Sequence, residues 1–207
     1  MSYLVPYGFG MDEFTEKKSR FMGRVWYCGS EREALGHIEL VKKEKTATHH
    51  AYAYSVKGEN VIRFSDDGEP GGTAGMPILE VFRREGIDDF VCTVTRWYGG
   101  IQLGAGGLTR AYAKGAKIAL DSAGTAELKP FCTLTLTAGY HLFERIKLAA
   151  EESGGEIEEA VYQAEIDVRI GMLKERTDGF IARIVEMSAG GVSPRIDGEK
   201  LIPVKIK

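Results

Sequence analysis

The 207-residue sequence has little of what marks several common classes of protein. Its three cysteines, Cys28, Cys92 and Cys132, lie far apart and form no Cys-x-x-Cys pair, which argues against a disulfide framework and a cysteine metal site. No apolar run approaches the roughly 18 residues that a membrane-spanning helix needs. The first residues have neither a basic leader nor an apolar core. We therefore expect a cytoplasmic protein with reduced, buried thiols and no membrane partner.

A basic excess is also absent. Lys and Arg number 27 against 30 Asp and Glu, which gives a formal net charge of −3. Residues 1–132 carry 17 basic and 17 acidic side chains, whereas residues 133–207 carry 10 and 13. Proteins that coat nucleic-acid phosphates usually have a basic excess. Any site for a polyanion must therefore be a local patch.

The second part of the chain has a simple order of strands and helices. Phe131–Ala138 alternates Thr with apolar residues, which predicts a half-buried strand. The order βαββαβ predicts a ferredoxin-like sandwich at residues 131–207, after a boundary near Lys129 and Pro130. Periodicity and Gly-Gly stops predict the other elements: helices at His141–Ser153 and Lys174–Ala189, and strands at Glu156–Tyr162, Glu165–Ile170 and Leu201–Ile206.

The first part, residues 1–130, is predicted to be a second domain, so the fold class is α+β. Ser30 and Glu33 form a capping box that opens a helix. The remaining expected elements are strand-like segments at Leu4–Tyr7 and Phe14–Cys28, a hairpin of His49–Val56 and Asn60–Phe64, a helix near Pro77–Arg84, a strand at Phe90–Thr95, and a helix ending near Ala123.

A glycine-rich segment between the last of these strands and the last helix is the densest functional signal. Glycine lets backbone N–H groups approach a ligand, and the free donors of a helix N-terminus favour an anion. The alternative is a tight connection whose glycines serve packing, because no Lys-Ser/Thr of a Walker motif follows. The segment is RWYGGIQLGAGGLTR, Arg96–Arg110, with glycines at Gly99, Gly100, Gly104, Gly106 and Gly107.

The helix after this loop carries Arg110, Lys114 and Lys117 on one face, opposite an apolar face. Such a stripe suits a phosphate backbone, although a solvated helix face is the commoner use. Trp97 and Tyr98 beside the loop could stack on bases. Adjacent strand residues point to opposite faces, so one of these two rings is expected in the core.

Metal chemistry and nucleophilic catalysis find little support. His49 and His50 are adjacent and diverge if they lie in a strand, and no His-x-x-x-His pair is present. The acidic segment Asp66–Pro70 is typical of a turn. No Gly-x-Ser-x-Gly elbow occurs. We expect no metal, no cofactor and no catalytic residue.

Two segments together resemble the signature of the IMPACT/YigZ family: FSDDGEPGGTAGMPIL at Phe64–Leu79 and VTRWYGGIQLGAGGLTRAY at Val94–Tyr112. The resemblance covers about residues 18–123, and the second half is similar to the ferredoxin-like domain of bacterial members. The motif falls on Asp66, Asp67, Gly68, Glu69, Pro70, Gly72 and Thr73, and on Arg96, Trp97, Tyr98, Gly99, Gly100 and Gly104.

The resemblance implies an N-terminal fold like the second domain of ribosomal protein S five, in a pairing similar to domains IV and V of elongation factor G. It also implies a link to translation control and no defining catalytic activity. We therefore expect a non-catalytic regulatory protein that binds structured RNA or the ribosome, with no sequence preference for DNA. The expected contacts are Arg96, the loop Gly99–Gly107, Arg110, Lys114 and Lys117.

Two alternatives remain open. The segment Leu103–Arg110 loosely resembles the phosphate loop of the GHMP kinases, which suggests an enzyme acting on a nucleotide or another phosphorylated small molecule. In that hypothesis Asp66, Asp67 or Glu69 would hold Mg²⁺ and Arg96 would clamp a phosphate. The other alternative is a protein-interaction module that uses the acidic sandwich sheet as its surface.

Overall fold

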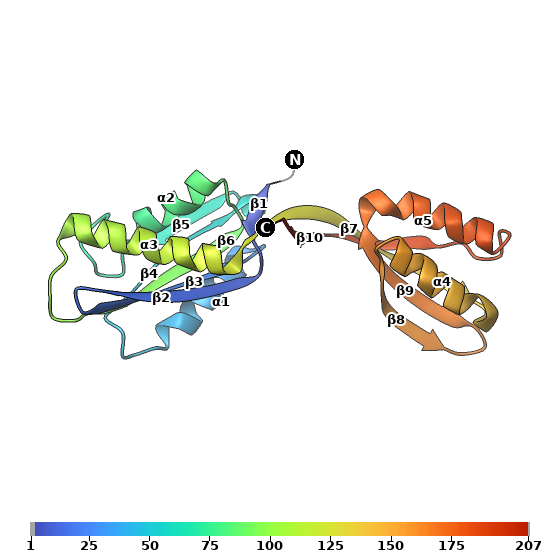
Figure 1. The fold of residues 1–207 in the computed structure, drawn as a ribbon, viewed down its shortest axis with the longest axis horizontal. Helices are drawn as coiled ribbons and strands as arrows, with labels where there is room; N and C mark the ends of the chain where they lie inside the picture. Colours follow the sequence, from blue (N-terminus) through green and yellow to red (C-terminus); the bar gives the residue numbers. More distant parts are fainter. Residues whose placement is uncertain (1–2, 207) are drawn as a thin grey trace. The chain divides into compact units, whose positions relative to one another are not determined.

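The computed structural model describes residues 3–206 and has an α+β architecture (Figure 1). Residues 129–202 form one compact unit, and the described residues before and after them form the other. In chain order the elements are β1 (Leu4–Pro6), β2 (Phe9–Glu16), β3 (Ser19–Tyr27), α1 (Glu31–Lys42), β4 (His49–Val56), a 3₁₀ turn (Lys57–Glu59), β5 (Val61–Ser65), α2 (Gly75–Glu85), β6 (Phe90–Trp97), α3 (Ala105–Ala123), β7 (Thr125–Ala138), α4 (Tyr140–Glu152), β8 (Glu156–Tyr162), β9 (Ile166–Leu173), α5 (Lys174–Met187) and β10 (Arg195–Lys205).

The first unit contains an antiparallel sheet with the strand order β2–β3–β6–β4–β5. Helices α2 and α3 cover one face and α1 lies on the other (Figure 1). The core under α2 and α3 includes the fully buried rings of Phe21, Phe82 and Tyr112. The apolar face predicted for the last helix of this unit is the face of α3 that enters this core.

The predicted strand Phe14–Cys28 is wrong, because the chain reverses within it to form the β2–β3 hairpin. Lys17 and Lys18 form the turn, with φ values of 44° and 64°. Two successive residues with positive φ match the type I′ turn, which Asn-Gly normally marks. A Lys-Lys turn carries no such signal.

Helix α3 lies close to strands β2 and β3 because glycines meet at their contact. A Cβ atom on Gly23 would lie 1.9 Å from the carbonyl oxygen of Gly115. One on Gly10 would lie 2.3 Å from the carbonyl oxygen of Ala119. These contacts set the height of α3 above the sheet, and with it the position of its N-terminus.

The second unit has the connectivity βαββαβ and the strand order β10–β7–β9–β8. This is the expected split βαβ arrangement. Leu134 and Leu136 of β7 point into the core formed with α4 and α5. The alternation predicted from the sequence is therefore confirmed for this strand.

Strand β7 runs through the expected boundary at Lys129 and Pro130 without a break. Its first residues pair with β1, where Leu4 is opposite Glu127. The last strand, β10, begins at Arg195, earlier than expected, and Ile206 N donates to Thr125 O beyond its end. Residues 203–206 thus belong to the first unit.

The three thiols are free and buried, as expected from their spacing. Burial, followed by the nearby Asp89, raises the pKa of Cys28 to about 12. Across residues 3–206, no helix combines the length and apolar character needed to span a membrane.

The glycine contact under α3 predicts that Gly23→Ala lowers the free energy of unfolding by about 1–3 kcal/mol, because the methyl group forces the helix off the sheet. Urea unfolding followed by circular dichroism measures this loss. The matched control is Gly36→Ala in α1, where a new Cβ meets no atom within 4 Å. At that position the better helix propensity of Ala should raise the free energy of unfolding by up to about 1 kcal/mol. Equal stability of both variants would contradict the packing argument.

Candidate functional site

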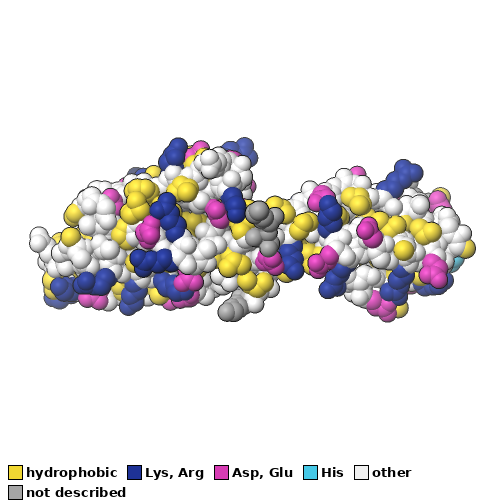
Figure 2. All heavy atoms as spheres, turned by 90° about the horizontal axis from the view of Figure 1, so that it is seen from above, with side chains coloured by type: hydrophobic (Ala, Val, Ile, Leu, Met, Phe, Trp, Pro, Cys, Tyr) yellow, Lys and Arg dark blue, Asp and Glu magenta, His cyan; other side chains and the backbone are white. Residues whose placement is uncertain are grey.

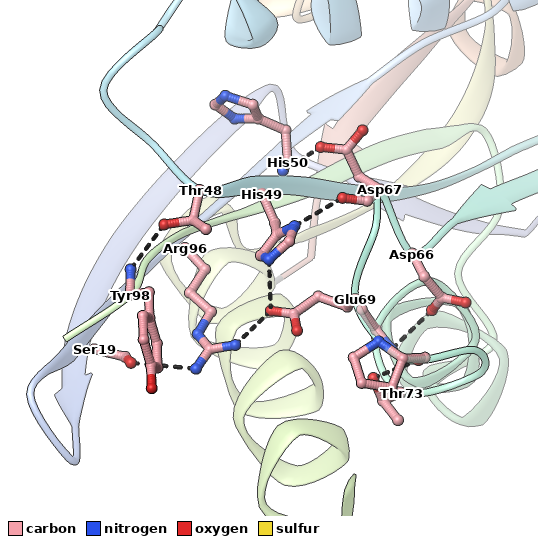
Figure 3. A network of polar contacts seen from close by, with 12 residues as sticks. Ser19, Thr48, His49, His50, Asp66, Asp67, Glu69, Thr73, Arg96 and Tyr98 are labelled. Carbon is pink, nitrogen blue, oxygen red and sulfur yellow. Dashed lines mark hydrogen bonds and ion pairs between the residues drawn. The ribbon is translucent and has the colours of Figure 1, made fainter. Parts of the chain in front are cut away.

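A buried ion pair joins the two signature segments (Figure 3). Arg96 of β6 donates through Nη1 to Oε1 of Glu69 at 2.7 Å, and their side chains are 6% and 3% exposed. Tyr112 of α3 donates its hydroxyl to the same oxygen at 2.7 Å. Ser19 Oγ accepts from Nη2 of Arg96 at 3.3 Å. Glu69 thus ties the loop after β5 to the central strand and to the longest helix.

The protonation of Tyr112 follows from its surroundings. Burial raises the pKa of its hydroxyl far above the ordinary value, and the hydrogen bond to Glu69 raises it further. The hydroxyl therefore stays protonated and donates to the carboxylate. In this low-dielectric interior, Arg96 and Tyr112 together stabilise a charge that would otherwise be costly to bury.

Asp66 organises the start of α2. Its Oδ1 accepts from the backbone N–H groups of Ala74 and Gly75, and its Oδ2 accepts from that of Gly72, at 2.8–2.9 Å. The N-cap residue Ala74 has no side-chain acceptor of its own, so Asp66 supplies it from across the loop. Burial alone would raise the pKa of Asp66, but the three N–H donors together lower it below the ordinary value of 3.8.

Asp67 fastens the same loop to β4. Its Oδ2 accepts from the backbone N–H of His50 at 2.7 Å, and its carbonyl oxygen accepts from Nδ1 of His49 at 2.8 Å. The two histidines diverge, as predicted. His50 Nδ1 lies 3.1 Å from Thr95 Oγ1, and His49 Nε2 lies 3.9 Å from Glu69 Oε1.

The acidic segment therefore sends its carboxylates to separate partners. Asp66 accepts hydrogen bonds at the N-terminus of α2, Asp67 accepts one from β4, and Glu69 accepts one from Arg96. In residues 3–206, no group of three or more His, Cys, Asp and Glu side chains is placed to hold a metal ion. This geometry gives no support to an Mg²⁺ site built from these three carboxylates.

The glycines of the loop before α3 have different roles. A Cβ on Gly99 would lie 2.0 Å from the carbonyl oxygen of Lys18, so this glycine allows the loop to pack on the β2–β3 turn. Gly100 and Gly104 have positive φ values of 82° and 73°. Gly106 is open apart from the Arg110 guanidinium at 3.6 Å from its would-be Cβ. One of these glycines thus serves packing, two serve the turn geometry of the loop, and Gly106 leaves open space at the start of α3.

The N-terminus of α3 has unused hydrogen-bond donors. Its N-cap residue, Gly104, provides no side-chain cap. The backbone N–H groups of Ala105, Gly106 and Gly107 donate to no acceptor within the described part of the chain. Such free donors and the helix dipole favour an anion.

A cavity of about 430 Å³ lies beside this helix start. Its walls include Glu69, Arg96, Tyr98, Gln102 and Ala105. Tyr98 is 45% exposed, and its ring centroid lies 5.2 Å from Cζ of Arg96. The cavity therefore combines a buried charged pair, an exposed ring and the free end of a helix.

Trp97 lies apart from this cavity. Its ring is half-buried, with Cζ of Arg20 3.7 Å from the ring centroid, and its Nε1 donates to Thr46 Oγ1. The expectation that either Trp97 or Tyr98 enters the core is wrong. Arg20 was not predicted, because its contact with Trp97 depends on the pairing of β3 with β6.

The predicted stripe of cations on α3 is shorter than expected. Lys117 is paired with Glu85 and Asp121, both at 2.9 Å. Arg110 and Lys114 are exposed and line a hollow of about 160 Å³ together with Lys17 of the β2–β3 turn and Glu16 at the end of β2. Figure 2 shows Lys and Arg interspersed with Asp and Glu on the face that it presents.

Lys17 and Lys18 were missed by sequence reasoning. Both are exposed, and Gly99 packs against the Lys18 backbone. The Lys-Lys pair was the available signal, but its position beside the glycine-rich loop depends on the hairpin. Arg96, predicted as a phosphate contact, is 5% exposed and engaged by Glu69.

These features define a two-unit α+β protein in which a buried Glu–Arg pair supports the glycine-rich start of a long helix. Residues 17–120 match the model of the Impact N-terminal domain, and residues 136–190 match a domain of unknown function, DUF1949. The chain belongs to the IMPACT family. This membership supports a translation-associated regulatory role in general terms.

The relatives cover nearly the whole chain. IMPACT family member YvyE of Bacillus subtilis (strain 168) is 35% identical over 192 residues, which are 91% of this chain and 88% of that protein. IMPACT family member YigZ of Escherichia coli (strain K12) is 33% identical over 180 residues, 85% of this chain and 88% of that protein. A solved structure described as "Crystal structure of an hypothetical protein" is 31% identical, with a TM-score of 0.60 over 95% of this chain and 98% of that one.

The hydrogen bonds of Asp66 predict that Asp66→Asn lowers the free energy of unfolding by about 1–3 kcal/mol at pH 7, because the charged acceptor of three N–H groups is lost. The folded pKa of Asp66 is depressed, so its stabilisation is complete above pH 3.8 and disappears as pH falls through the folded pKa. Urea unfolding of both proteins should therefore give a constant difference at neutral pH that narrows below about pH 4. Asp12→Asn, at an exposed position of β2, is the control and should cost little at any pH.

The ion pair predicts strong coupling between Glu69 and Arg96. Glu69→Leu or Arg96→Met alone should lower the free energy of unfolding by about 3–5 kcal/mol, because each leaves a buried charge without its partner. The loss in the double variant should be smaller than the sum of the two single losses by at least about 1 kcal/mol. Urea unfolding of the parent, both single variants and the double variant measures this difference as a double-mutant cycle. Strict additivity would show that the two side chains do not stabilise each other.

Proposed function

We propose that this IMPACT family member is a non-catalytic regulator of translation that binds structured RNA, including ribosomal RNA. The binding surface is centred on the start of α3 and the β2–β3 turn. In this proposal the domain of residues 1–130 carries the RNA site, and the ferredoxin-like residues 131–207 form its companion domain.

One observation carries the proposal. Lys17, Arg110 and Lys114 outnumber the single acidic side chain, Glu16, in one hollow. The same hollow is lined by Gly107, whose N–H at the start of α3 donates to no acceptor among the described residues. A helix end by itself is worth only about 0.3–1 kcal/mol at an exposed site. Several cations around it are needed to hold a phosphate backbone, and release of counterions then favours binding.

The buried pair explains why other cations are proposed as the phosphate contacts. Arg96 is already neutralised by Glu69, and Lys117 by Glu85 and Asp121. Lys18 joins the proposed set because it is exposed in the turn that packs on Gly99. The proposed phosphate contacts are therefore Lys17, Lys18, Arg110 and Lys114.

Four phosphate contacts predict that log K falls with log salt concentration at a slope of about −3 to −4. Arg110→Glu with Lys114→Glu should weaken RNA binding at least tenfold and reduce the slope by about 2. Fluorescence anisotropy with a labelled ribosomal RNA fragment, from 50 to 200 mM salt, measures both quantities.

The matched control reverses the exposed cations Arg145 and Lys147 of α4 to Glu, with the same change in net charge. This variant should bind as the parent does. Salt-independent binding would contradict the proposal, and so would equal weakening by both double variants.

Sedimentation of the tagged protein in lysate tests the ribosomal source of the RNA. Salt-sensitive comigration with ribosomal particles is expected. Migration at the top of the gradient under every condition would remove the ribosome as the partner. An association that survives nuclease and high salt would instead identify a protein partner.

A further inference from the structure

One oxygen of Glu69 has no hydrogen-bond donor. Oε1 accepts from Arg96 and Tyr112, whereas Oε2 accepts from no residue that the structure describes. Figure 3 shows the contacts to His49 and Arg96 converging on one oxygen and none on the other. The residue is 8% exposed, and Oε2 is not among the described side-chain atoms that are both buried and without a partner, so this oxygen is open to solvent. Because Glu69 lines the 430 Å³ cavity, an occupant of the cavity can donate to Oε2 in place of water.

The charge balance favours a neutral donor over a cation. Arg96 already offsets the charge of Glu69 at 2.7 Å. A carboxylate oxygen has two lone pairs, and both of those on Oε2 are free. The best complement is therefore a neutral group with two adjacent N–H donors.

Guanine meets this requirement on its Watson–Crick edge, where the ring N1–H lies next to the exocyclic N2 amino group. Adenine and cytosine place a ring acceptor beside their amino group, which would face the carboxylate unfavourably. Uracil offers one N–H between two carbonyl oxygens. The other cavity walls also suit a base, because Tyr98 presents an exposed ring for stacking.

The cavity adjoins the proposed RNA surface. Leu103 lines both the 430 Å³ cavity and the basic hollow. Gly104 and Ala105, at the anion-favouring end of α3, line the cavity. A strand held on Lys17 and Arg110 could thus place one base beside Glu69 and its phosphate at the helix end. The volume falls within the range of about 300–1,000 Å³ common for small-ligand pockets.

We propose that this cavity is a recognition pocket for a single unstacked guanine nucleotide, with Glu69 as the group that selects the base. The inference rests on the proposed RNA-binding function and names the nucleotide that the same surface prefers. Guanine within an RNA strand and a free guanine mononucleotide offer the same edge, so both are tested.

Anisotropy with labelled ten-nucleotide single-stranded RNAs tests the inference. The strands are all adenosine except for one central position, which is adenosine, guanosine, cytidine, uridine or inosine. Guanosine should bind about tenfold tighter than adenosine, and inosine, which lacks the N2 amino group, should be intermediate. Affinities within twofold for all five strands would overturn the inference.

Glu69→Gln places an amide NH₂ group at the position of the free oxygen and keeps an acceptor for Arg96 and Tyr112. The ratio of guanosine to adenosine affinity should fall to about one. Tyr98→Ala should weaken the guanosine strand about tenfold, while Tyr140→Ala, an exposed ring on α4, should not. If Glu69→Gln does not fold, two measurements still test the inference. They are the binding of the five RNAs to the parent protein and the comparison of Tyr98→Ala with Tyr140→Ala.

Direct titration of guanosine and adenosine monophosphates into the parent protein, followed by calorimetry, separates this inference from the proposed function. Salt-dependent RNA binding without any base preference overturns the pocket and keeps the function. Binding of guanosine monophosphate with no binding of any RNA supports the pocket and overturns the function. Binding of neither overturns both.

Discussion

The buried contact of Glu69 with Arg96 and Tyr112 is the interaction on which the first unit depends. It connects three segments that are far apart in sequence, since Arg96 lies 27 positions and Tyr112 lies 43 positions after Glu69. A carboxylate this deeply buried requires compensation by charge and by hydrogen bonds. Once it is compensated, the loop after β5, the central strand β6 and the helix α3 occupy one defined arrangement, and the cavity beside them has fixed walls.

The carboxylates of the acidic segment are therefore used in contacts within the protein. The segment is compatible with an anion site nearby. Asp66 accepts from three backbone N–H groups, Asp67 accepts from one and pairs with Lys42, and the charge of Glu69 is matched by Arg96. The hollow lined by Lys17, Arg110, Lys114 and Glu16 thus keeps its excess of cations although the acidic motif belongs to the same unit.

Local patterns predicted the elements that local forces control. The Thr alternation of Phe131–Ala138 appears in the structure, and so does the N-cap at Ser30, whose side chain accepts from the Glu33 N–H. The Glu33 side chain accepts from Gly29 N–H, one residue before the expected donor. In the site, the glycine-rich segment correctly marked the start of α3, but Arg96 and Lys117 turned out to be paired with carboxylates. Such pairing depends on which strands and helices become neighbours, and sequence spacing carries no record of it.

The α+β class, the order of most elements, the family signature and the limit that any polyanion site must be local could all be predicted from the sequence. Composition and short-range periodicity are sufficient for these properties, because they depend on neighbouring residues along the chain. Three features became visible in the folded chain alone: Lys17 and Lys18 turn beside Gly99, Glu69 is buried with one oxygen free, and a cavity lies at the start of α3. These features arise from contacts between distant segments, where burial and charge compensation select one arrangement from many that share the same local pattern.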